Sequence, residues 1–207
     1  MKIVVITDSS LKDELLTQGL QESAEITWLR EPASIGTTDC IIDLLFHPDK
    51  NRVEFLRSLS SSVVMINSVS VTLKNLPENF VRINGWPTFL KRILVEASST
   101  TDHAKVTAEN IFTAFGKKTE WTPDIPGFIS ARVVSTIINE AYFTLEEKVS
   151  SKQEIDTAMK LGTNYPYGPF EWSEKIGLKS IYDLLQILSK ENRRYEPCPL
   201  LKKEALA

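Results

Sequence analysis

The sequence predicts an α/β domain built on a parallel sheet, followed by an all-α domain. Through residue 115, short apolar runs rich in β-branched residues alternate with segments of helical periodicity, the pattern of strands and helices alternating around a parallel sheet. The composition changes between Gly116 and Pro126, and beyond this stretch the apolar residues recur with a helical period and no strand signal is found. We therefore expect domains at residues 1–121 and 122–207.

Composition indicates a globular protein and excludes several classes. The 207 residues are 42% hydrophobic, enough to bury a core. The net charge of -3, with both signs interspersed, provides no basic surface for nucleic acid. The opening apolar run, Ile3 to Ile6, is too short for a secretory signal or a membrane span, so we expect a cytoplasmic protein with no membrane partner.

The cysteine and histidine residues give no sign of a disulfide or a metal site. Cys40 and Cys198 are isolated in a chain without a secretory signal, so we expect both to be buried, reduced thiols. Neither His47 nor His103 has a cysteine or a second histidine at ligand spacing. No metal is therefore expected.

The chain opens with a strand, a turn and a helix. Lys2 to Thr7 is an apolar run typical of a central strand, and Asp8-Ser-Ser10 can cap the helix that follows. A dinucleotide-binding unit begins in this way, but it needs Gly-x-Gly-x-x-Gly at the turn so that the backbone can approach a pyrophosphate. Those glycines are absent, and the Asp8 carboxylate would repel the phosphates. A plain strand-turn-helix is favoured, with Glu31 a loosely spaced candidate for ribose binding.

Further strands and helices alternate up to the boundary. The predicted strands are residues 26–29, 39–46, 62–66, 79–83 and 92–96. The predicted helices are residues 51–59 and 101–115, the second capped by Thr101 or Asp102. A loop is expected from Pro32 to Thr38 and a turn from Asn84 to Pro87.

The second domain is predicted to be a set of helices joined by stiff turns. Val134 to Leu145 has a broad apolar face, and Ser151 with Glu154 forms a capping box before a second helix that should end at Gly162. The turn 166–169 leads to a short helix, residues 170–175, and the last long helix has apolar residues at 181, 184, 185 and 188. The tail after Arg193, with Pro197 and Pro199, is expected to be frayed or draped over the surface.

Several separated motifs carry a resemblance to a known family. They are Asp124-x-Pro-Gly-Phe-Ile with Arg132, Asn139-Glu-Ala141, Ile155-Asp-x-Ala-Met-Lys-x-Gly162, and Tyr165-Pro-x-Gly-Pro-Phe-Glu171 with Ile176-Gly-Leu178. In this order and spacing they closely resemble the 3-hydroxyacyl-CoA dehydrogenase family. Upstream, the weaker matches are Asp39 to Asp43, Asn67 to Thr72 and Leu94 to Glu96. The resemblance implies a truncated Rossmann-like domain and a helical carboxy-terminal domain that forms homodimers.

The resemblance also implies an activity and the residues for it. The family oxidises 3-hydroxyacyl-CoA with NAD in fatty acid metabolism, using a His as general base, a Glu that orients it, and a Ser and an Asn that bind the substrate oxygen. Glu96 lies at the Glu position and Ser68 at the Ser position. Asn84 stands where the His is expected and Ala131 where the Asn is expected. The segment from Glu31 to Thr38 is short where the family inserts elements that contact CoA.

For NAD, the candidate contacts are Thr7, Asp8 and Ser9 after the first strand, and Asp43, which the resemblance places near the nicotinamide. Asn does not titrate near neutral pH, so the family's general base is missing. His47 is an alternative base on the nicotinamide side. The bland alternatives are that Ser68 is a turn residue and that the Pro-Gly-Phe and Gly-Pro-Phe turns are packing joints.

Glu96 also has a bland interpretation, in which it is solvated or paired with Lys91 or Arg92. Two functions therefore remain open. One is an oxidoreductase of the 3-hydroxyacyl-CoA dehydrogenase type with reduced activity. The other is a non-catalytic homologue, a pseudoenzyme, that acts as a dimeric acyl-CoA-binding, ligand-binding or scaffold protein.

Overall fold

The computed structural model describes residues 1–21, 24–33, 36–59 and 61–207. The chain divides into two compact units, residues 1–128 and 129–207. The division follows Phe128, whereas the sequence places it after Trp121. The loop predicted from Pro32 to Thr38 lies partly outside the described residues. Within the described ranges, no helix is both long enough and apolar enough to cross a membrane.

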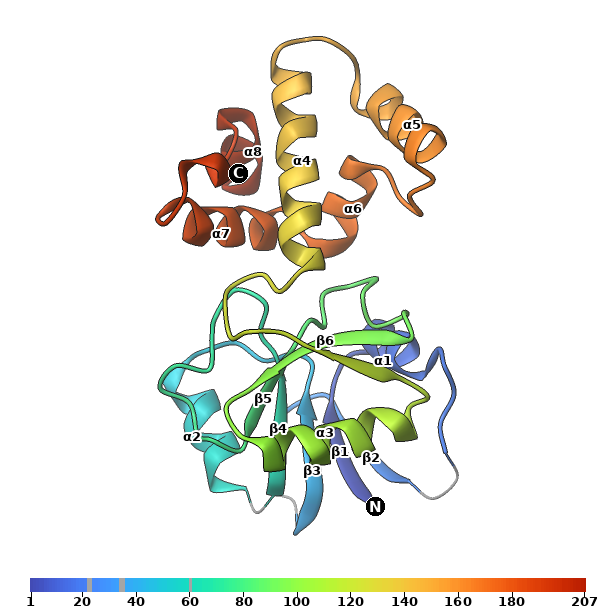
Figure 1. The fold of residues 1–207 in the computed structure, drawn as a ribbon, viewed down its shortest axis with the longest axis vertical. Coiled ribbons are helices and arrows are strands. Elements are labelled where there is room, and N and C mark those ends of the chain that lie inside the picture. The colour runs from blue at the N-terminus through green and yellow to red at the C-terminus, as the bar shows by residue number, and fades with distance from the viewer. Residues whose placement is uncertain (22–23, 34–35, 60) are drawn as a thin grey trace. The chain divides into compact units, whose positions relative to one another are not determined.

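The first unit is a seven-stranded sheet with helices on both faces, which confirms the predicted α/β class (Figure 1). The strands are β1 (Lys2–Ile6), β2 (Glu25–Leu29), β3 (Thr38–Asp43), β4 (Ser61–Asn67), β5 (Phe80–Ile83), β6 (Leu94–Ser99) and β7 (Lys118–Trp121). Their order in the sheet is β2-β1-β3-β4-β5-β6-β7. As predicted, β1 is central, because it pairs in parallel with both β2 and β3.

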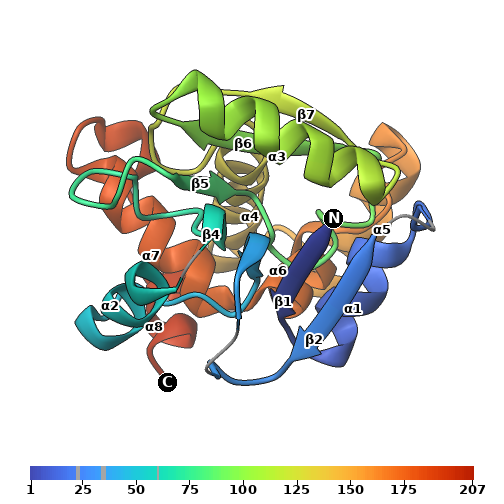
Figure 2. The same cartoon turned by 90° about the horizontal axis from the view of Figure 1, so that it is seen from below.

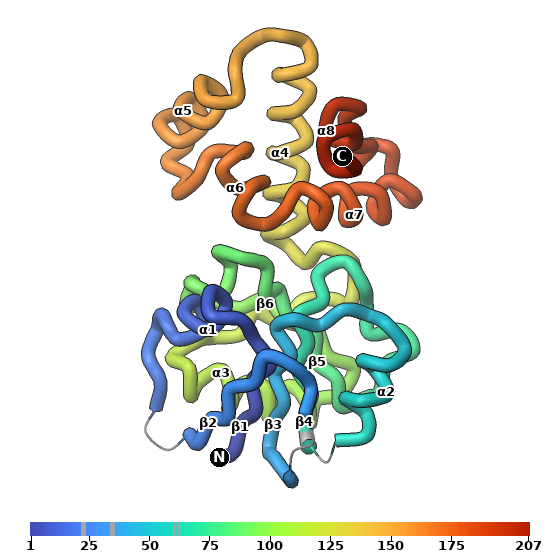
Figure 3. The backbone as a smooth tube through the Cα atoms, turned by 180° about the vertical axis from the view of Figure 1, so that it is seen from behind, coloured from blue at the N-terminus to red at the C-terminus, as the bar shows by residue number. Residues whose placement is uncertain are grey.

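Two apolar cores lie on opposite faces of the sheet because successive side chains of β1 alternate between them. Ile3 and Val5 pack with α1 (Ser9–Leu16) and α3 (Asp102–Ala114), and α3 runs along this face of the sheet in Figure 2. Val4 and Ile6 belong to the core on the other face, which is covered by α2 (Lys50–Ser58) between β3 and β4 (Figure 3). The three helices thus sandwich the sheet.

Two features of the sheet differ from the prediction. The sheet is not wholly parallel, because β5 and β6 are antiparallel neighbours joined by the loop after Asn84. The strand β7, parallel to β6, was not predicted. It is a short edge strand whose residues are exposed or half-buried, so it has no apolar run to mark it.

The second unit is all helical, as predicted. Its helices are α4 (Ser130–Glu146), α5 (Lys152–Thr163), α6 (Pro169–Ile176), α7 (Leu178–Ser189), a 3-10 turn η1 (Arg193–Tyr195) and α8 (Pro199–Ala205). The long helix α4 contacts α6, α7 and α8, and α5 packs on α6. The predicted capping box is confirmed at the start of α5, where Ser151 and Glu154 bond reciprocally.

The end of α5 and the tail of the chain differ from the prediction. Gly162 lies inside α5, and Asn164 takes the left-handed capping conformation with φ 56°. The tail is not loosely draped, since Cys198 and Leu201 are fully buried. Asn139 on α4 explains the docking, because its side chain accepts from the Cys198 N–H at 2.8 Å and donates to the Glu196 carbonyl at 2.9 Å.

Candidate functional site

In the turn between β1 and α1, Asp8 caps the N-terminus of the helix. Asp8 is the N-cap of α1, and its Oδ1 accepts the Leu11 N–H at 2.8 Å. The Thr7 hydroxyl donates to the Asp8 carbonyl at 3.1 Å, while Ser9 is exposed. An anion at a helix N-terminus needs these backbone donors, so a phosphate here would have to displace a bound carboxylate.

Asp43 ends β3 with its side chain fully buried and committed to Arg52. The guanidinium of Arg52 donates to both carboxylate oxygens at 2.7 Å, and the Leu45 N–H donates to Oδ1 at 3.1 Å. Burial raises the pKa of Asp43, and the bonds from Arg52 oppose that rise. The structure therefore brings Asp43 together with a helix of its own unit, in a bidentate pair that leaves little acceptor capacity for a cofactor.

Asn84 and Glu96 face each other across β5 and β6. The register pairs Ile83 with Ala97, and the Asn84 N–H donates to the Glu96 carbonyl at 2.9 Å, so the next two residues are directly opposite. Their side chains meet as well, since Asn84 Nδ2 donates to Glu96 Oε2 at 2.7 Å. Both are buried. Glu96 is thus neither a simple surface carboxylate nor a member of a His–Glu pair.

Ser68 lies beside this pair. Its backbone N–H donates to the carbonyl of Ile83, the residue before Asn84, at 3.3 Å. Its hydroxyl donates to the Val71 carbonyl at 2.7 Å, which closes the turn after β4. The hydroxyl of Ser68 therefore acts as the turn interpretation predicts, while its backbone is bonded to the residue before Asn84.

Asn67, one residue earlier, was not singled out from the sequence. Its amide donates to the carbonyls of Leu44 and Gly85 at 3.1 and 3.0 Å and accepts the Gly85 N–H at 3.0 Å. It thereby joins the carboxyl ends of β3, β4 and β5. A Cβ at position 85 would lie 2.8 Å from the Asn67 side chain, so this close approach requires glycine.

His47 is poorly placed to act as a general base. Its Nδ1 lies 3.1 Å from the Leu45 carbonyl and its Nε2 lies 3.1 Å from Asp49 Oδ2. Both ring nitrogens are therefore engaged, and a general base needs one that faces the substrate. His103 is exposed in the first turn of α3. Ala131 is fully buried in α4 of the second unit, where its methyl group offers no hydrogen bond.

A buried arginine was also missed by the sequence reading. Arg82 in β5 is fully buried, and its Nε lies 3.2 Å from Asp124 Oδ1 in the Asp124-x-Pro-Gly-Phe motif. Burial lowers the pKa of Arg82 to about 10, and Asp124 opposes the fall. Arg82 interrupts the apolar strand Phe80–Ile83, which is the signal that could have marked it as a buried, paired charge.

The motifs of the second unit hold helices together. Asp156 on α5 accepts the N–H groups of Phe170 and Glu171 at 2.8 and 3.2 Å, so it caps α6 from a neighbouring helix. Gly168 lies directly beneath this carboxylate, and a Cβ there would approach Asp156 Oδ1 to 2.3 Å. The two motifs that contain these residues therefore specify a single joint.

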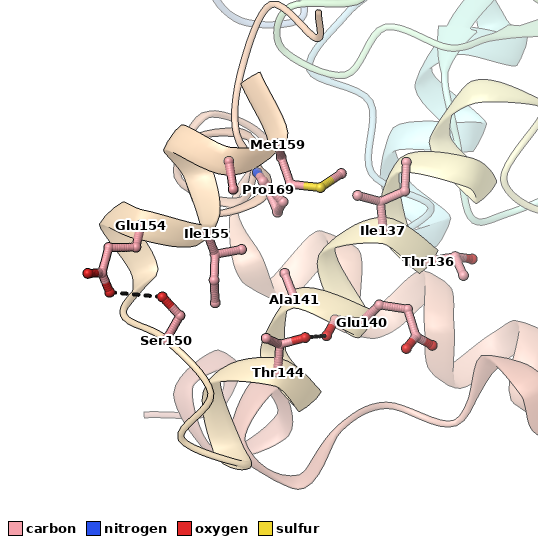
Figure 4. Close-up of a pocket in the computed structure, with 11 residues that line it drawn as sticks. Thr136, Ile137, Glu140, Ala141, Thr144, Ser150, Glu154, Ile155, Met159 and Pro169 are labelled. Carbon is pink, nitrogen blue, oxygen red and sulfur yellow. Dashed lines mark hydrogen bonds between the residues drawn. The ribbon is translucent and has the colours of Figure 1, made fainter. Parts of the chain in front are cut away.

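An apolar groove lies between α4 and α5 in this unit, with a volume of about 460 Å³. Ile137 and Ala141 project from α4 toward Ile155 and Met159 of α5, and polar groups such as Glu140, Thr144 and Ser150 lie at its rim (Figure 4). Such a groove suits an apolar partner better than a polar ligand.

With this geometry in view, comparison with known proteins identifies the helical unit. A family model described as 3-hydroxyacyl-CoA dehydrogenase, C-terminal domain, matches residues 127–207. The resemblance to the 3-hydroxyacyl-CoA dehydrogenase family is confirmed. The match covers the whole second unit.

Individual 3-hydroxyacyl-CoA dehydrogenase relatives agree. The 3-hydroxyadipyl-CoA dehydrogenase of Escherichia coli (strain K12) is 46% identical over 93 residues, 44% of this chain and 20% of that protein. The 3-hydroxybutyryl-CoA dehydrogenase of Bradyrhizobium diazoefficiens is 37% identical over 146 residues, 66% of this chain and 50% of that protein. The chain thus spans half or less of the length of these curated relatives.

For the fold, the crystal structure of (S)-3-hydroxybutyryl-CoA dehydrogenase from Ralstonia eutropha aligns with a TM-score of 0.76 and 19% identity, covering 98% of this chain and 92% of that one. This likeness confirms the Rossmann-like sheet followed by helices. Of the candidate site residues, Ser68, Asn84 and Glu96 lie at one end of β4, β5 and β6. The candidate NAD contacts do not join them. Thr7, Asp8 and Asp43 make hydrogen bonds within the first unit, and Ser9 is exposed.

Proposed function

We propose that this chain is a 3-hydroxyacyl-CoA dehydrogenase relative in which NAD-dependent oxidation is reduced or lost. The observation that carries the proposal is the 2.7 Å bond between Asn84 and Glu96. The pair keeps the geometry of an oriented side chain beside a carboxylate, but an amide takes no proton near neutral pH. General-base catalysis, which contributes roughly 10²–10⁴-fold, is therefore missing.

The cofactor site supports the same proposal. NAD, the cofactor expected from the family, would meet the Asp8 carboxylate at the turn where its pyrophosphate belongs, and Asp43 is already paired with Arg52. The residues present therefore do not fit NAD well. The connection between β2 and β3 is residues 30–37, which is short for a segment that must also contact CoA.

The test is to titrate the protein with NADH, following tryptophan fluorescence, and to assay NADH oxidation with acetoacetyl-CoA. We expect weak or no NADH quenching and little or no turnover. Saturable NADH binding together with turnover that Glu96→Gln abolishes would contradict the proposal and restore Glu96 and Ser68 to catalytic roles.

A second variant tests the missing base directly. Asn84→His places an imidazole beside the Glu96 carboxylate, which should raise the pKa of the new histidine above its ordinary value of about 6.5. We expect NMR titration to show this rise, and any acetoacetyl-CoA turnover present in the natural chain to increase. A histidine that titrates at or below its ordinary pKa would show that the Asn84–Glu96 geometry does not resemble a His–Glu pair.

The alternative function is a non-catalytic homodimer that binds acyl-CoA or another ligand, or serves as a scaffold. The apolar groove between α4 and α5 favours it, because an open surface of this kind is stabilised by a second copy. We expect light scattering to give a dimer at micromolar concentration, Ile137→Glu to give a monomer, and the exposed control Lys190→Glu to remain dimeric. A monomeric natural chain would contradict this.

A further inference from the structure

Arg82 joins two segments of the first unit that are far apart in the chain. Its Nη1 donates to the Val71 carbonyl at 3.0 Å, in the turn after β4. Its Nη2 donates to the Ile125 carbonyl at 2.5 Å, and its Nε faces Asp124 at 3.2 Å. One fully buried guanidinium therefore holds both the turn that begins with Ser68 and the segment 122–128.

Asp124 makes the same connection from the other side. Its Oδ1 faces Arg82, and its Oδ2 accepts the Leu73 N–H at 2.9 Å. A backbone bond from the Gly127 N–H to the Val69 carbonyl, 2.8 Å, lies alongside. Hydrogen bonds from Arg82, from Asp124 and between the two backbones therefore connect residues 68–73 with residues 124–127.

The connection reaches the hydroxyl of Ser68 directly. The Val71 carbonyl accepts from Ser68 Oγ at 2.7 Å and from Arg82 Nη1 at 3.0 Å, so the two side chains share one acceptor. Arg82 lies in β5, two residues before Asn84, which directly follows the strand. A displacement of Arg82 would release the carbonyl that orients Ser68.

The end of the segment is held in an unfavourable backbone conformation. Gly127 and Phe128 both have positive φ, 88° and 49°, and for phenylalanine this costs free energy. The Phe128 ring is buried and packs against the guanidinium of Arg82. The distance from the ring centroid to Arg82 Cζ is 4.2 Å. The cation–π contact stabilises the strained residue.

We propose that Arg82 and Asp124 are positioning residues that fix the Ser68 turn and the segment 122–128 as one rigid piece beside Asn84 and Glu96. That this rigid piece helps to bind a ligand rests on the proposed function. That the piece is rigid does not depend on it. Neither residue was marked as a site by the sequence, and the Asp124 motif thereby acquires a structural partner in the first unit.

Backbone amide exchange measured by NMR tests the rigid piece. Asp124→Asn should increase the exchange rates of Leu73 and Gly127 by about tenfold or more, and Arg82→Met should do the same if Asp124→Asn proves too mild. Arg82→Lys, which keeps the charge but not the fork of donors, should fall between the natural chain and Arg82→Met.

The matched control is Glu14→Gln, which weakens another buried carboxylate of the same unit. Glu14 accepts the Thr88 N–H at 2.8 Å, so its variant should accelerate exchange at Thr88 and leave Leu73 and Gly127 unchanged. Asp124→Asn should give the reverse pattern. Unchanged exchange at Leu73 and Gly127, or a uniform increase across the unit in both variants, would overturn the proposal.

A titration with acetoacetyl-CoA separates positioning from general stability. If the probe binds, Asp124→Asn should weaken binding about fivefold or more, and Glu14→Gln should not. Equal weakening by both variants would show that the pair has only a general structural role. If no variant binds the probe, ligand binding under the proposed function fails, and the exchange pattern alone decides whether the rigid piece exists.

Discussion

The two units of this molecule use the residues of one family in different ways. In the second unit the motif residues do the work of assembly, since Asp156 caps α6 and Asn139 holds the tail. In the first unit, the residues expected to contact a cofactor or substrate make hydrogen bonds to other residues of the chain. Asp8 caps α1, Asp43 pairs with Arg52, and Asn84 bonds to Glu96.

The difference shows that the family match and most of the residues expected to carry the family's chemistry lie in different units. The family model matches residues 127–207, and the motif residues Asn139, Asp156 and Gly168 make packing contacts within that unit. The polar residues at the ends of the strands in the first unit are explained by internal hydrogen bonds. Substitutions in each unit can test this contrast.

The largest effect is expected at the buried pair of the first unit. Arg52→Met would leave the Asp43 carboxylate buried without its bidentate partner, so we expect the free energy of unfolding to fall by about 3–5 kcal/mol. Chemical denaturation followed by circular dichroism measures it, with exposed Arg57→Met on the same helix as the control. A loss no greater than that of the control would show that Asp43 is free for another role.

The joint between α5 and α6 should be the most sensitive point of the second unit. In Gly168→Ala the added Cβ would lie 2.3 Å from Asp156 Oδ1, and the forced shift should cost about 1–3 kcal/mol. Gly162→Ala is the control, because nothing lies within 4 Å of its Cβ, and it should stabilise α5 by roughly 0.5–1 kcal/mol. Thermal unfolding distinguishes the opposite signs. Equal effects would contradict the joint.

Lys117 predicts a pH dependence confined to the first unit. Burial lowers the pKa of Lys117 to about 8, with Glu14 opposing the fall, so the folded state releases a proton that the unfolded state keeps up to about pH 10.5. Because the unfolded state then binds more protons, the contribution of Lys117 to stability rises between pH 8 and 10.5, by at most about 1.4 kcal/mol per pH unit.

Lys117→Met should remove this rise, although it also loses the bonds from Lys117 Nζ to the carbonyls of Leu90 and Arg92. The measurement is the difference in the free energy of unfolding between the two proteins at pH 8, 9 and 10. A difference that stays constant over this range would mean that the pKa of Lys117 is not lowered.

The smallest expected effect concerns the capping box. Ser151→Ala removes the hydroxyl that accepts the Glu154 N–H, and we expect a loss of about 1 kcal/mol. Half-buried Ser189→Ala, at the end of α7, is the control in thermal unfolding. An equal loss in both variants would show that the box adds nothing to the stability of the second unit.

Features with a local signal in the sequence were predicted correctly. The strand β1 is marked by its apolar run, and Ser151 with Glu154 are three residues apart, so both features were predicted. The prediction was wrong where the signal is not local: β7 has no apolar run to mark it, and the alternation of strands and helices did not indicate that β6 is antiparallel to β5.

The candidate site shows the same limit more sharply. Alignment by residue spacing with the family motifs was enough to place Asn84 and Ala131 at the expected His and Asn positions. The ion-pair partners were not predicted: Asp43 pairs with Arg52 on α2, and Arg82 pairs with Asp124. Such pairings depend on how distant segments meet in the fold. The spacing of residues in the sequence does not predict these pairings.

The contact between Asn67 and Gly85 has an evolutionary consequence. A side chain at position 85 would clash with Asn67, and replacing Asn67 alone would remove the hydrogen bonds that join the ends of β3, β4 and β5. The two positions should vary together among homologues, so that a side chain at 85 is accompanied by a smaller or differently directed residue at 67.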